Sequence, residues 1–280
     1  MATRLLGNPF FDGLAAEHRT WLSAFDARYL VNWERMLNVN EESAFAEARV
    51  RRLMQGYGAR VEPNEDLTGG ETGAEPRPDF QCFAGKDKFY VEVTCISIDT
   101  ATAKTAIPDV PGGETSSRRA APFRPLTGAV VAKCSGKAKQ CANLDAPALV
   151  AIGTFHTVAA MVSFHKGVVD WVLTGRTRLA WDADIHAERQ VDETYQLADL
   201  DSAAFLCRDE TQDVGYARSS ISGLLLCRLG SEPLRVLGVL HPNPARPFNP
   251  AMLPEIEFGR VAIDRASRQL RVTWPNGDGE

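Results

Sequence analysis

Apolar residues recur at helical spacing in two stretches near the N-terminus. Residues 13–38, GLAAEHRTWLSAFDARYLVNWERMLN, follow this spacing and predict one or two helices. The next helix is predicted to begin after Asn40, a favourable N-cap, and to end at Gly56 and Gly58. Its buried stripe is predicted to consist of Ala46, Val50, Leu53 and Tyr57.

Strand patterns follow the helices. Residues 59–63, ARVEP, predict a short strand, and residues 79–84 and 88–96 predict a hairpin that turns at AGKD. After a predicted helix at about 129–144, residues 147–155, PALVAIGTF, are almost continuously apolar. An unbroken apolar run of this length is typical of a strand covered on both faces, as in a layered α/β sheet.

The remaining segments divide by their periodicity. Residues 97–127 are rich in Pro, Gly, Ser and Thr, have no periodicity, and predict a long loop. Residues 156–215 look mostly helical and irregular, whereas 221–274 contain four runs that predict strands. The order of elements indicates an α/β protein with a β-rich C-terminal region.

Length and composition are those of a globular protein. A chain of 280 residues can bury a sizeable core in one or two domains. It contains no uncharged apolar stretch of about 18 residues, so we expect a soluble, cytoplasmic protein without a membrane partner. Reduced thiols in a cytosolic core explain the cysteines better than disulfides or a metal site, because no CxxC pair occurs among Cys82, Cys95, Cys134, Cys141, Cys207 and Cys227.

Charge is unevenly distributed along the chain. The formal net charge of −5 argues against strong, indiscriminate binding to nucleic acid. Residues 101–145, however, carry seven Lys and Arg against three Asp and Glu, whereas 182–213 carry ten acids against two Arg. The basic surplus follows directly after residues 78–95, the stretch with the strongest candidate chemistry, so the acidic total does not exclude DNA.

That stretch, PDFQCFAGKDKFYVEVTC, places two carboxylates in one hairpin. Alternate residues of a strand share a face, so Glu92 and Thr94 are predicted to point together into a cleft. Asp79 begins the partner strand and is predicted to lie close to Glu92. Two neighbouring carboxylates repel unless a cation or a shared proton compensates, and hard oxygen ligands favour Mg²⁺ or Mn²⁺. An ordinary hairpin with a turn Asp and a solvated Glu92 is the alternative.

Two predicted helices carry further polar residues toward this hairpin. Glu47 lies at the border of the first buried stripe, while Lys133, Lys137 and Gln140 line one flank of the 129–144 helix. Lys137 is nearest to the buried side of that flank. Taken alone, Glu47 is an ordinary helix-surface charge, and the two lysines are equally well explained as snorkelling side chains.

Together these residues resemble the PD-(D/E)xK nuclease superfamily. The resemblance covers residues 40–156 and rests on Glu47, Pro78-Asp79, Glu92-Val93-Thr94, and Lys137 with Gln140. It implies a restriction-endonuclease-like fold, a three-layer α/β/α core with a mixed central sheet. Residues 1–39 would then form an N-terminal helical segment, and 157–280 a helical and then β-rich region packed on the core.

The resemblance also implies an activity and its residues. It implies a metal-dependent DNA endonuclease that hydrolyses phosphodiester bonds, of a restriction, repair or phage-defence type, with Mg²⁺ or Mn²⁺ as cofactor. Asp79 and Glu92 would be metal ligands, and Glu47 an additional one. Thr94 stands where the family has its lysine. Because some members take the equivalent amine from the following helix, Lys137 is the first candidate for that amine and Lys133 the second, with Gln140 orienting the site or contacting a backbone phosphate.

The resemblance further implies DNA as the partner and favours a homodimer, because double-strand cutting often uses two-fold symmetry. Candidate DNA contacts are Arg118, Arg119 and Arg124. An alternative of a different class stays open: a catalytically inactive nuclease-fold module for DNA binding or protein assembly. Thr94 in place of lysine and the acidic segment 182–213 favour that alternative.

Overall fold

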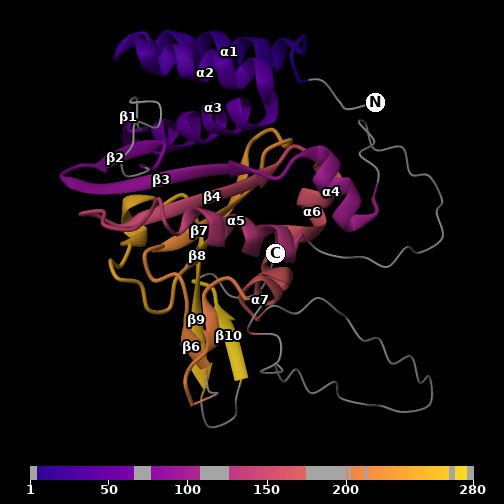
Figure 1. Ribbon diagram of the computed structural model, residues 1–280, viewed down its shortest axis with the longest axis vertical. Coiled ribbons are helices and arrows are strands. Elements are labelled where there is room, and N and C mark those ends of the chain that lie inside the picture. The colour runs from indigo at the N-terminus through magenta and orange to yellow at the C-terminus, as the bar shows by residue number, and fades with distance from the viewer. Residues whose placement is uncertain are drawn as a thin grey trace.

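The fold is a mixed α/β structure built on one large mixed sheet. It was obtained as a computed structural model, which describes residues 5–65, 77–107, 126–174, 200, 203–211, 214–264 and 269–275. Eight strands form the sheet in the order β1-β2-β3-β4-β7-β8-β9-β10. Helices lie on both faces, with α1, α2 and α3 stacked above the sheet and α5 in front of it in Figure 1. The predicted α/β class is confirmed.

Three helices form the N-terminal layer. They are α1 (Pro9–Leu22), α2 (Ala27–Val39) and α3 (Glu41–Gly56). Residues 13–38 therefore form two helices, separated by a turn that leads to Asp26, the N-cap of α2. Asn40 is the N-cap of α3, as predicted, because its side chain accepts a hydrogen bond from the backbone N–H of Ser43. Ala46 and Val50 are buried, while Leu53 and Tyr57 lie half-buried at the border of the stripe.

The predicted hairpin and its neighbours are present. Strand β1 (Arg60–Pro63) pairs with β2 (Phe80–Ala84), which pairs antiparallel with β3 (Asp87–Cys95). Strand β4 (Ala148–Thr154) runs parallel between β3 and β7 (Gly223–Arg228). All seven residues of β4 are buried, which confirms the prediction of a strand covered on both faces.

Two predictions between β3 and β4 were wrong in detail. The segment 97–127, predicted as a loop, contains the helix α4 (Ile98–Thr105), whose N-cap is Ser97. This short helix is rich in Thr and Ala and shows too little apolar periodicity to be recognised. Helix α5 (Thr127–Lys137) is shorter than the predicted 129–144, and turns follow it.

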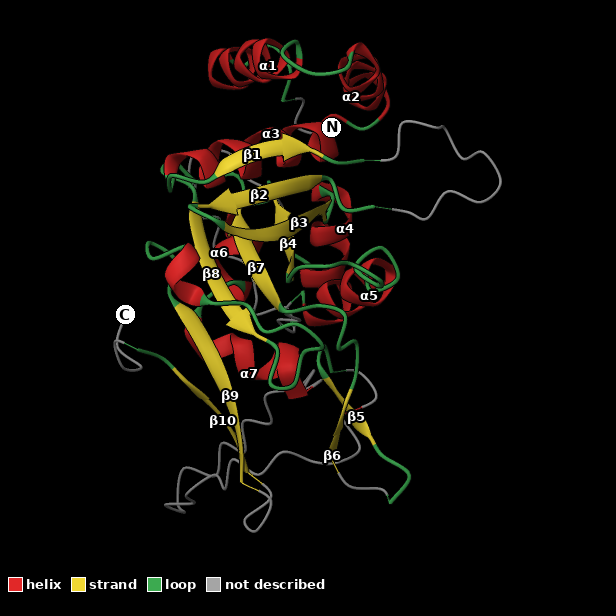
Figure 2. Cartoon of the chain, turned by 90° about the vertical axis from the view of Figure 1, so that its left-hand side faces the viewer, coloured by secondary structure: helices red, strands yellow, loops and turns green. Residues whose placement is uncertain are grey.

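In the chain after β4, strands β7 to β10 extend the same sheet, whereas β5 and β6 form a separate antiparallel pair (Figure 2). The helices of this region are α6 (Thr157–Ser163) and α7 (Lys166–Thr174), and its 3-10 helix is η2 (Pro250–Met252). The strands are β5 (Leu206–Arg208), β6 (Val214–Tyr216), β8 (Arg235–Leu240), β9 (Phe258–Asp264) and β10 (Gln269–Thr273). The four strands expected within 221–274 are present. The division at residues 39/40 and 156/157 stays a prediction, and the sheet continues across the second boundary.

Each face of the sheet carries its own core, and strand alternation decides which residues face each core. Val91, Val93 and Cys95 pack on the side of α1 and α3, whereas Tyr90 and Ile96 pack on the side of α5, α6 and α7. Glu92 and Thr94 consequently face α5, as their alternation predicted. All six cysteines are free thiols. Within the described ranges, no helix is long and apolar enough to cross a membrane.

Candidate active site

A cavity of about 400 Å³ opens between β3 and the helices α2, α3 and α5. Its lining includes six residues singled out from the sequence: Glu47, Asp79, Thr94, Lys133, Lys137 and Gln140. Glu92, the seventh, has no exposed surface. Residues from five separate elements or turns therefore meet at one place.

The Asp79–Glu92 pair is held by the backbone of its own hairpin. Phe80 pairs with Val91, so the register brings Asp79 opposite Glu92. The backbone N–H of Val93 donates to Asp79 Oδ2 at 2.6 Å, and the N–H of Asp79 donates to Glu92 Oε2 at 3.2 Å. One oxygen of each carboxylate is thus fixed by a main-chain donor, which orients both groups without the help of other side chains.

Lys137 reaches the pair from the last residue of α5. Its Nζ lies 2.5 Å from Glu92 Oε1, the oxygen that the hairpin backbone does not engage. The Lys137 side chain remains 28% exposed while Glu92 is fully buried, so the ammonium lies between the buried carboxylate and the cavity. Thr94, two residues after Glu92, lines the same cavity. The amine is therefore present beside the second acid, although β3 does not provide it.

Lys133 and Gln140, the two remaining predicted residues, also line the cavity but are held by different kinds of backbone. Lys133 lies one turn before Lys137 on α5 and lines the cavity. Gln140 also lines the cavity, but the prediction that it belongs to the helix was wrong, because α5 ends at Lys137. Gln140 lies in the turns that follow, so its side chain is positioned by irregular backbone rather than by helical spacing.

Glu47 contributes a third carboxylate from α3. Its side chain is half-buried and makes no hydrogen bond or ion pair with the described part of the chain. Burial, followed by the charges of Asp79, Glu65 and Glu92, raises the pKa of Glu47 well above its usual range. A carboxylate in this position is suited to receive a cation.

The pKa values of both carboxyl groups of the pair are raised above their usual range. Burial and then the charge of Asp79 raise the pKa of Glu92 to about 8, and burial raises the pKa of Asp79 to about 6. Burial alone would lower the pKa of Lys137, but the contact with Glu92 and the charges of Asp79 and Glu47 together outweigh burial, and the pKa is raised. Lys137 therefore stays charged, but its charge does not return the pKa values of Glu92 and Asp79 to their usual range.

Glu65 was not identified from the sequence. It follows β1, is half-buried, and has its pKa raised to about 7 by burial and then by the charge of Asp79, an effect that Arg35 partly offsets. The sequence placed Glu65 in a Gly- and Glu-rich connection. Its one available signal was an acid two residues after a predicted strand, which is too common to single out a residue.

The carboxylates around the cavity form a candidate set of ligands for Mg²⁺. No group of three or more His, Cys, Asp or Glu within the described ranges lies close enough together to hold a metal ion. Mg²⁺ is commonly held by one or two carboxylates and keeps several waters. Asp79 and Glu92, with Glu47 at the cavity wall, fit that requirement, because oxygen donors meet in one cavity and their raised pKa values mean that a cation there would stabilise the charged carboxylates.

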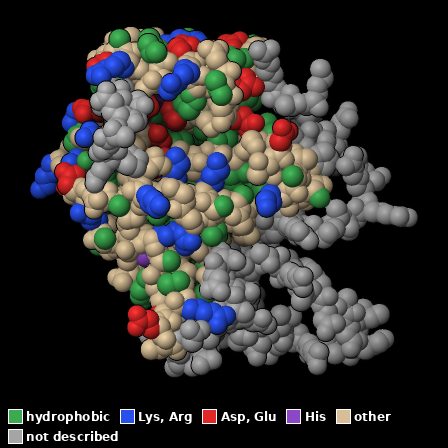
Figure 3. Space-filling model, viewed as in Figure 1, with side chains coloured by type: hydrophobic (Ala, Val, Ile, Leu, Met, Phe, Trp, Pro, Cys, Tyr) green, Lys and Arg blue, Asp and Glu red, His purple; other side chains and the backbone are tan. Residues whose placement is uncertain are grey.

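Basic side chains lie on and around α5, and two of them, Lys133 and Lys137, line the cavity. Lys and Arg gather across the middle of the face on which α5 lies (Figure 3). Lys133 and Lys139 belong to α5 and the turns after it, and the Arg218 guanidinium lies against α5 through a 2.8 Å hydrogen bond from its Nε to Ser135 Oγ. The predicted DNA contacts Arg118, Arg119 and Arg124 lie outside the described residues.

Comparison of the chain with family models, curated proteins and solved structures gives no significant match. The case for a nuclease therefore depends on the residues and their geometry. Four of these residues carry most of it: Glu47, Asp79, Glu92 and Lys137.

The shifted carboxyl groups predict how stability depends on pH. In the folded protein Glu92 keeps its proton up to a pH of about 8, whereas the unfolded chain releases it near 4.5. Raising the pH between these values therefore favours the unfolded state, and the free energy of unfolding is expected to fall. Asp79 and Glu65, with pKa values raised to about 6 and about 7, act in the same direction.

Urea unfolding of the metal-free protein at several pH values between 5 and 8.5 measures this slope. The Glu92→Gln variant, which has no proton to release at this position, is expected to show a shallower decline. A free energy of unfolding that rises steadily across the window would contradict the assignment.

Proposed function

We propose that this protein is a metal-dependent DNA endonuclease of the PD-(D/E)xK type, with a restriction-endonuclease-like core. The observation that carries the proposal is the 2.5 Å contact between Lys137 Nζ and Glu92 Oε1 beside Asp79. Two acids and an amine beside the second acid are the groups that this chemistry requires. They come from residues 79, 92 and 137, which only the fold brings together.

The carboxylates of the site and Lys137 would have different roles. Asp79 and Glu92 would hold Mg²⁺ or Mn²⁺, with Glu47 as a further ligand, direct or through water. When bound, the metal supplies Lewis-acid stabilisation of the phosphate and lowers the pKa of its water. Lys137 stays protonated, so its ammonium would position water and add positive charge beside the phosphate without accepting a proton.

The surroundings of the cavity support a polyanionic substrate. Lys133 lies on α5, Lys139 lies in the turns after it, and Arg218 contacts α5 through Ser135. Figure 3 shows Lys and Arg side chains on the face where α5 lies. Phosphate contacts of this kind supply affinity that does not depend on sequence and weakens with salt. Gln140 at the cavity wall would orient the site or contact a backbone phosphate.

Incubation with supercoiled plasmid tests the proposal. The wild-type protein is expected to nick plasmid in the presence of Mg²⁺ or Mn²⁺, and Asp79→Asn to lower the initial rate by about 100-fold or more, since it removes a proposed metal ligand. Asp87→Asn is the matched control, because Asp87 is an exposed acid in the same hairpin.

Equal nicking by wild type and Asp79→Asn would refute the assignment of the site. DNA binding without nicking under either metal would instead favour an inactive nuclease-fold module. Calorimetry with Mn²⁺ separates the two, because the inactive module is expected to give no heat of metal binding.

A further inference from the structure

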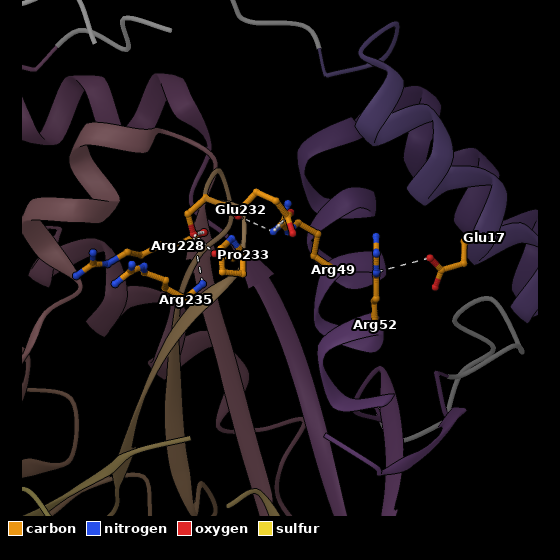
Figure 4. A network of polar contacts seen from close by, with 8 residues as sticks. Glu17, Arg49, Arg52, Arg228, Glu232, Pro233 and Arg235 are labelled. Carbon is orange, nitrogen blue, oxygen red and sulfur yellow. Dashed lines mark hydrogen bonds and ion pairs between the residues drawn. The ribbon is translucent and has the colours of Figure 1, made fainter. Parts of the chain in front are cut away.

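A second cluster of basic residues lies on the β7–β8 hairpin. Arg228 and Arg235 are direct partners in the antiparallel register, so both side chains leave the same face of the sheet. Figure 4 shows them extending side by side in the same direction. Like charges placed directly opposite each other are destabilising. The two neighbouring guanidinium groups form a pair of donors suited to one anion.

The structure holds Arg228 firmly in place. Its Nε and Nη2 donate to the carbonyl oxygen of Phe164 at 3.0 and 2.8 Å. Phe164 is the C-cap residue of α6, so this arginine links the end of β7 to the turn between α6 and α7. A guanidinium fixed in this way keeps its orientation when a ligand arrives, which reduces the entropic cost of binding.

The nearest acid of the hairpin turns away from the arginine pair. Glu232 accepts a hydrogen bond from Arg49 of α3 at 3.2 Å, and the same Arg49 donates to the carbonyl of Ser231 at 2.7 Å. Figure 4 shows Glu232 directed toward α3. Arg235 itself makes no side-chain hydrogen bond or ion pair with the described residues. Glu232 therefore does not neutralise Arg235.

Both arginines line a cavity of about 620 Å³ between the hairpin and the α6–α7 turn. His165 and Lys166 face the same space, and Glu255 is the one acid among the residues that line it within the described chain. Lys166 also pairs with Glu257 at 3.0 Å. The rest of the wall is largely apolar and includes Met161, Phe164 and Leu237. The volume falls in the usual range for small-molecule sites, about 300–1,000 Å³.

We propose that this cavity binds a phosphorylated small molecule of nucleotide size, with its phosphate between Arg228 and Arg235. Paired guanidinium groups match the oxygens of a phosphate, and the apolar wall suits the organic part of such a ligand. The cavity shares no lining residue with the candidate active site. The proposal therefore stands or falls independently of the nuclease activity.

Calorimetric titration of the full chain with AMP, in low salt and with EDTA to exclude metal, tests the site. AMP is expected to bind, inorganic phosphate to compete with it, and Arg235→Glu to weaken binding by about tenfold or more, since a charge-assisted hydrogen bond is lost. Arg235 is exposed, so this variant is expected to fold. Arg260→Glu is the matched control, because Arg260 is exposed on β9 and outside the cavity.

The outcomes separate the sources of phosphate. AMP binding that depends on Arg235 but not on Arg260 supports the proposal. If AMP and phosphate give no heat while a short DNA duplex binds in an Arg235-dependent manner, the arginines bind backbone phosphates of DNA. The small-molecule proposal is then overturned. Binding that is equal in wild type and Arg235→Glu, or no binding of any probe, overturns it as well.

Discussion

Lys137→Ala is expected to lower the initial rate of metal-dependent plasmid nicking by about 10²- to 10³-fold, the usual cost of losing one group that stabilises developing charge. The reason is geometric. Lys137 Nζ is the amine 2.5 Å from Glu92, and β3 provides none, because Thr94 occupies the corresponding position. Single-turnover nicking with enzyme in excess measures the effect on chemistry rather than on product release.

Lys139→Ala is the matched control for this prediction. Lys139 lies two residues further along and is exposed, so its loss is expected to change the rate by no more than a few-fold through weaker phosphate contacts. Lys133→Ala is expected to have an intermediate effect, because Lys133 lines the cavity without contacting Glu92. Circular dichroism must show that Lys137→Ala remains folded, since it removes the charge partner of a buried acid.

The second large effect is expected from Glu92→Gln, which keeps the shape of the side chain and removes its charge. Nicking is expected to fall to background, and calorimetry with Mn²⁺ is expected to show no binding heat, because an amide oxygen is a poor substitute for a carboxylate ligand. The same change is expected to leave the metal-free protein at least as stable as wild type at pH 9. Glu92 is then a buried charge close to Asp79, and the variant no longer has it.

If Glu92→Gln loses nicking and Mn²⁺ binding while the folded protein stays at least as stable as wild type, the lost activity is explained by the loss of a metal ligand and not by damage to the fold. Glu210→Gln, at an exposed acid far from the cavity lining, is the control and is expected to bind Mn²⁺ as wild type does. Unchanged Mn²⁺ affinity in Glu92→Gln would remove Glu92 from the metal site.

Strand alternation explains why much of this site was visible in the sequence. Once residues 88–96 are taken as a strand, Glu92 and Thr94 must share one face, and the apolar residues Val91, Val93 and Cys95 must point to the other. The tight hairpin then brings Asp79 opposite Glu92. These are local constraints, so they can be derived from a short stretch without knowledge of the rest of the fold.

Features that depend on tertiary contacts were less accessible. The end of α5 at Lys137 has no capping signal in the sequence, and Gln140 was therefore assigned to a helix that does not reach it. Helix α4 is short and most of its residues are small. Burial of Ile98 in the core on the α1 and α3 side and of Ala101 in the core on the α5 side, rather than periodicity, stabilises it. Glu65 approaches Asp79 because β1 lies at the sheet edge next to β2, a pairing that the residues of β1 alone do not specify.

The central claim is that an amine from α5 serves the carboxylate pair of the hairpin. It is tested most directly by the initial rates of Mg²⁺-dependent plasmid nicking for wild type, Lys137→Ala, and Lys137→Ala combined with Thr94→Lys. Thr94 faces the same cavity, so a lysine there is expected to restore part of the lost rate. The predicted order is wild type fastest, the double variant intermediate and Lys137→Ala slowest. Nicking by folded Lys137→Ala at the wild-type rate, or no nicking by wild type with either Mg²⁺ or Mn²⁺, would contradict the claim.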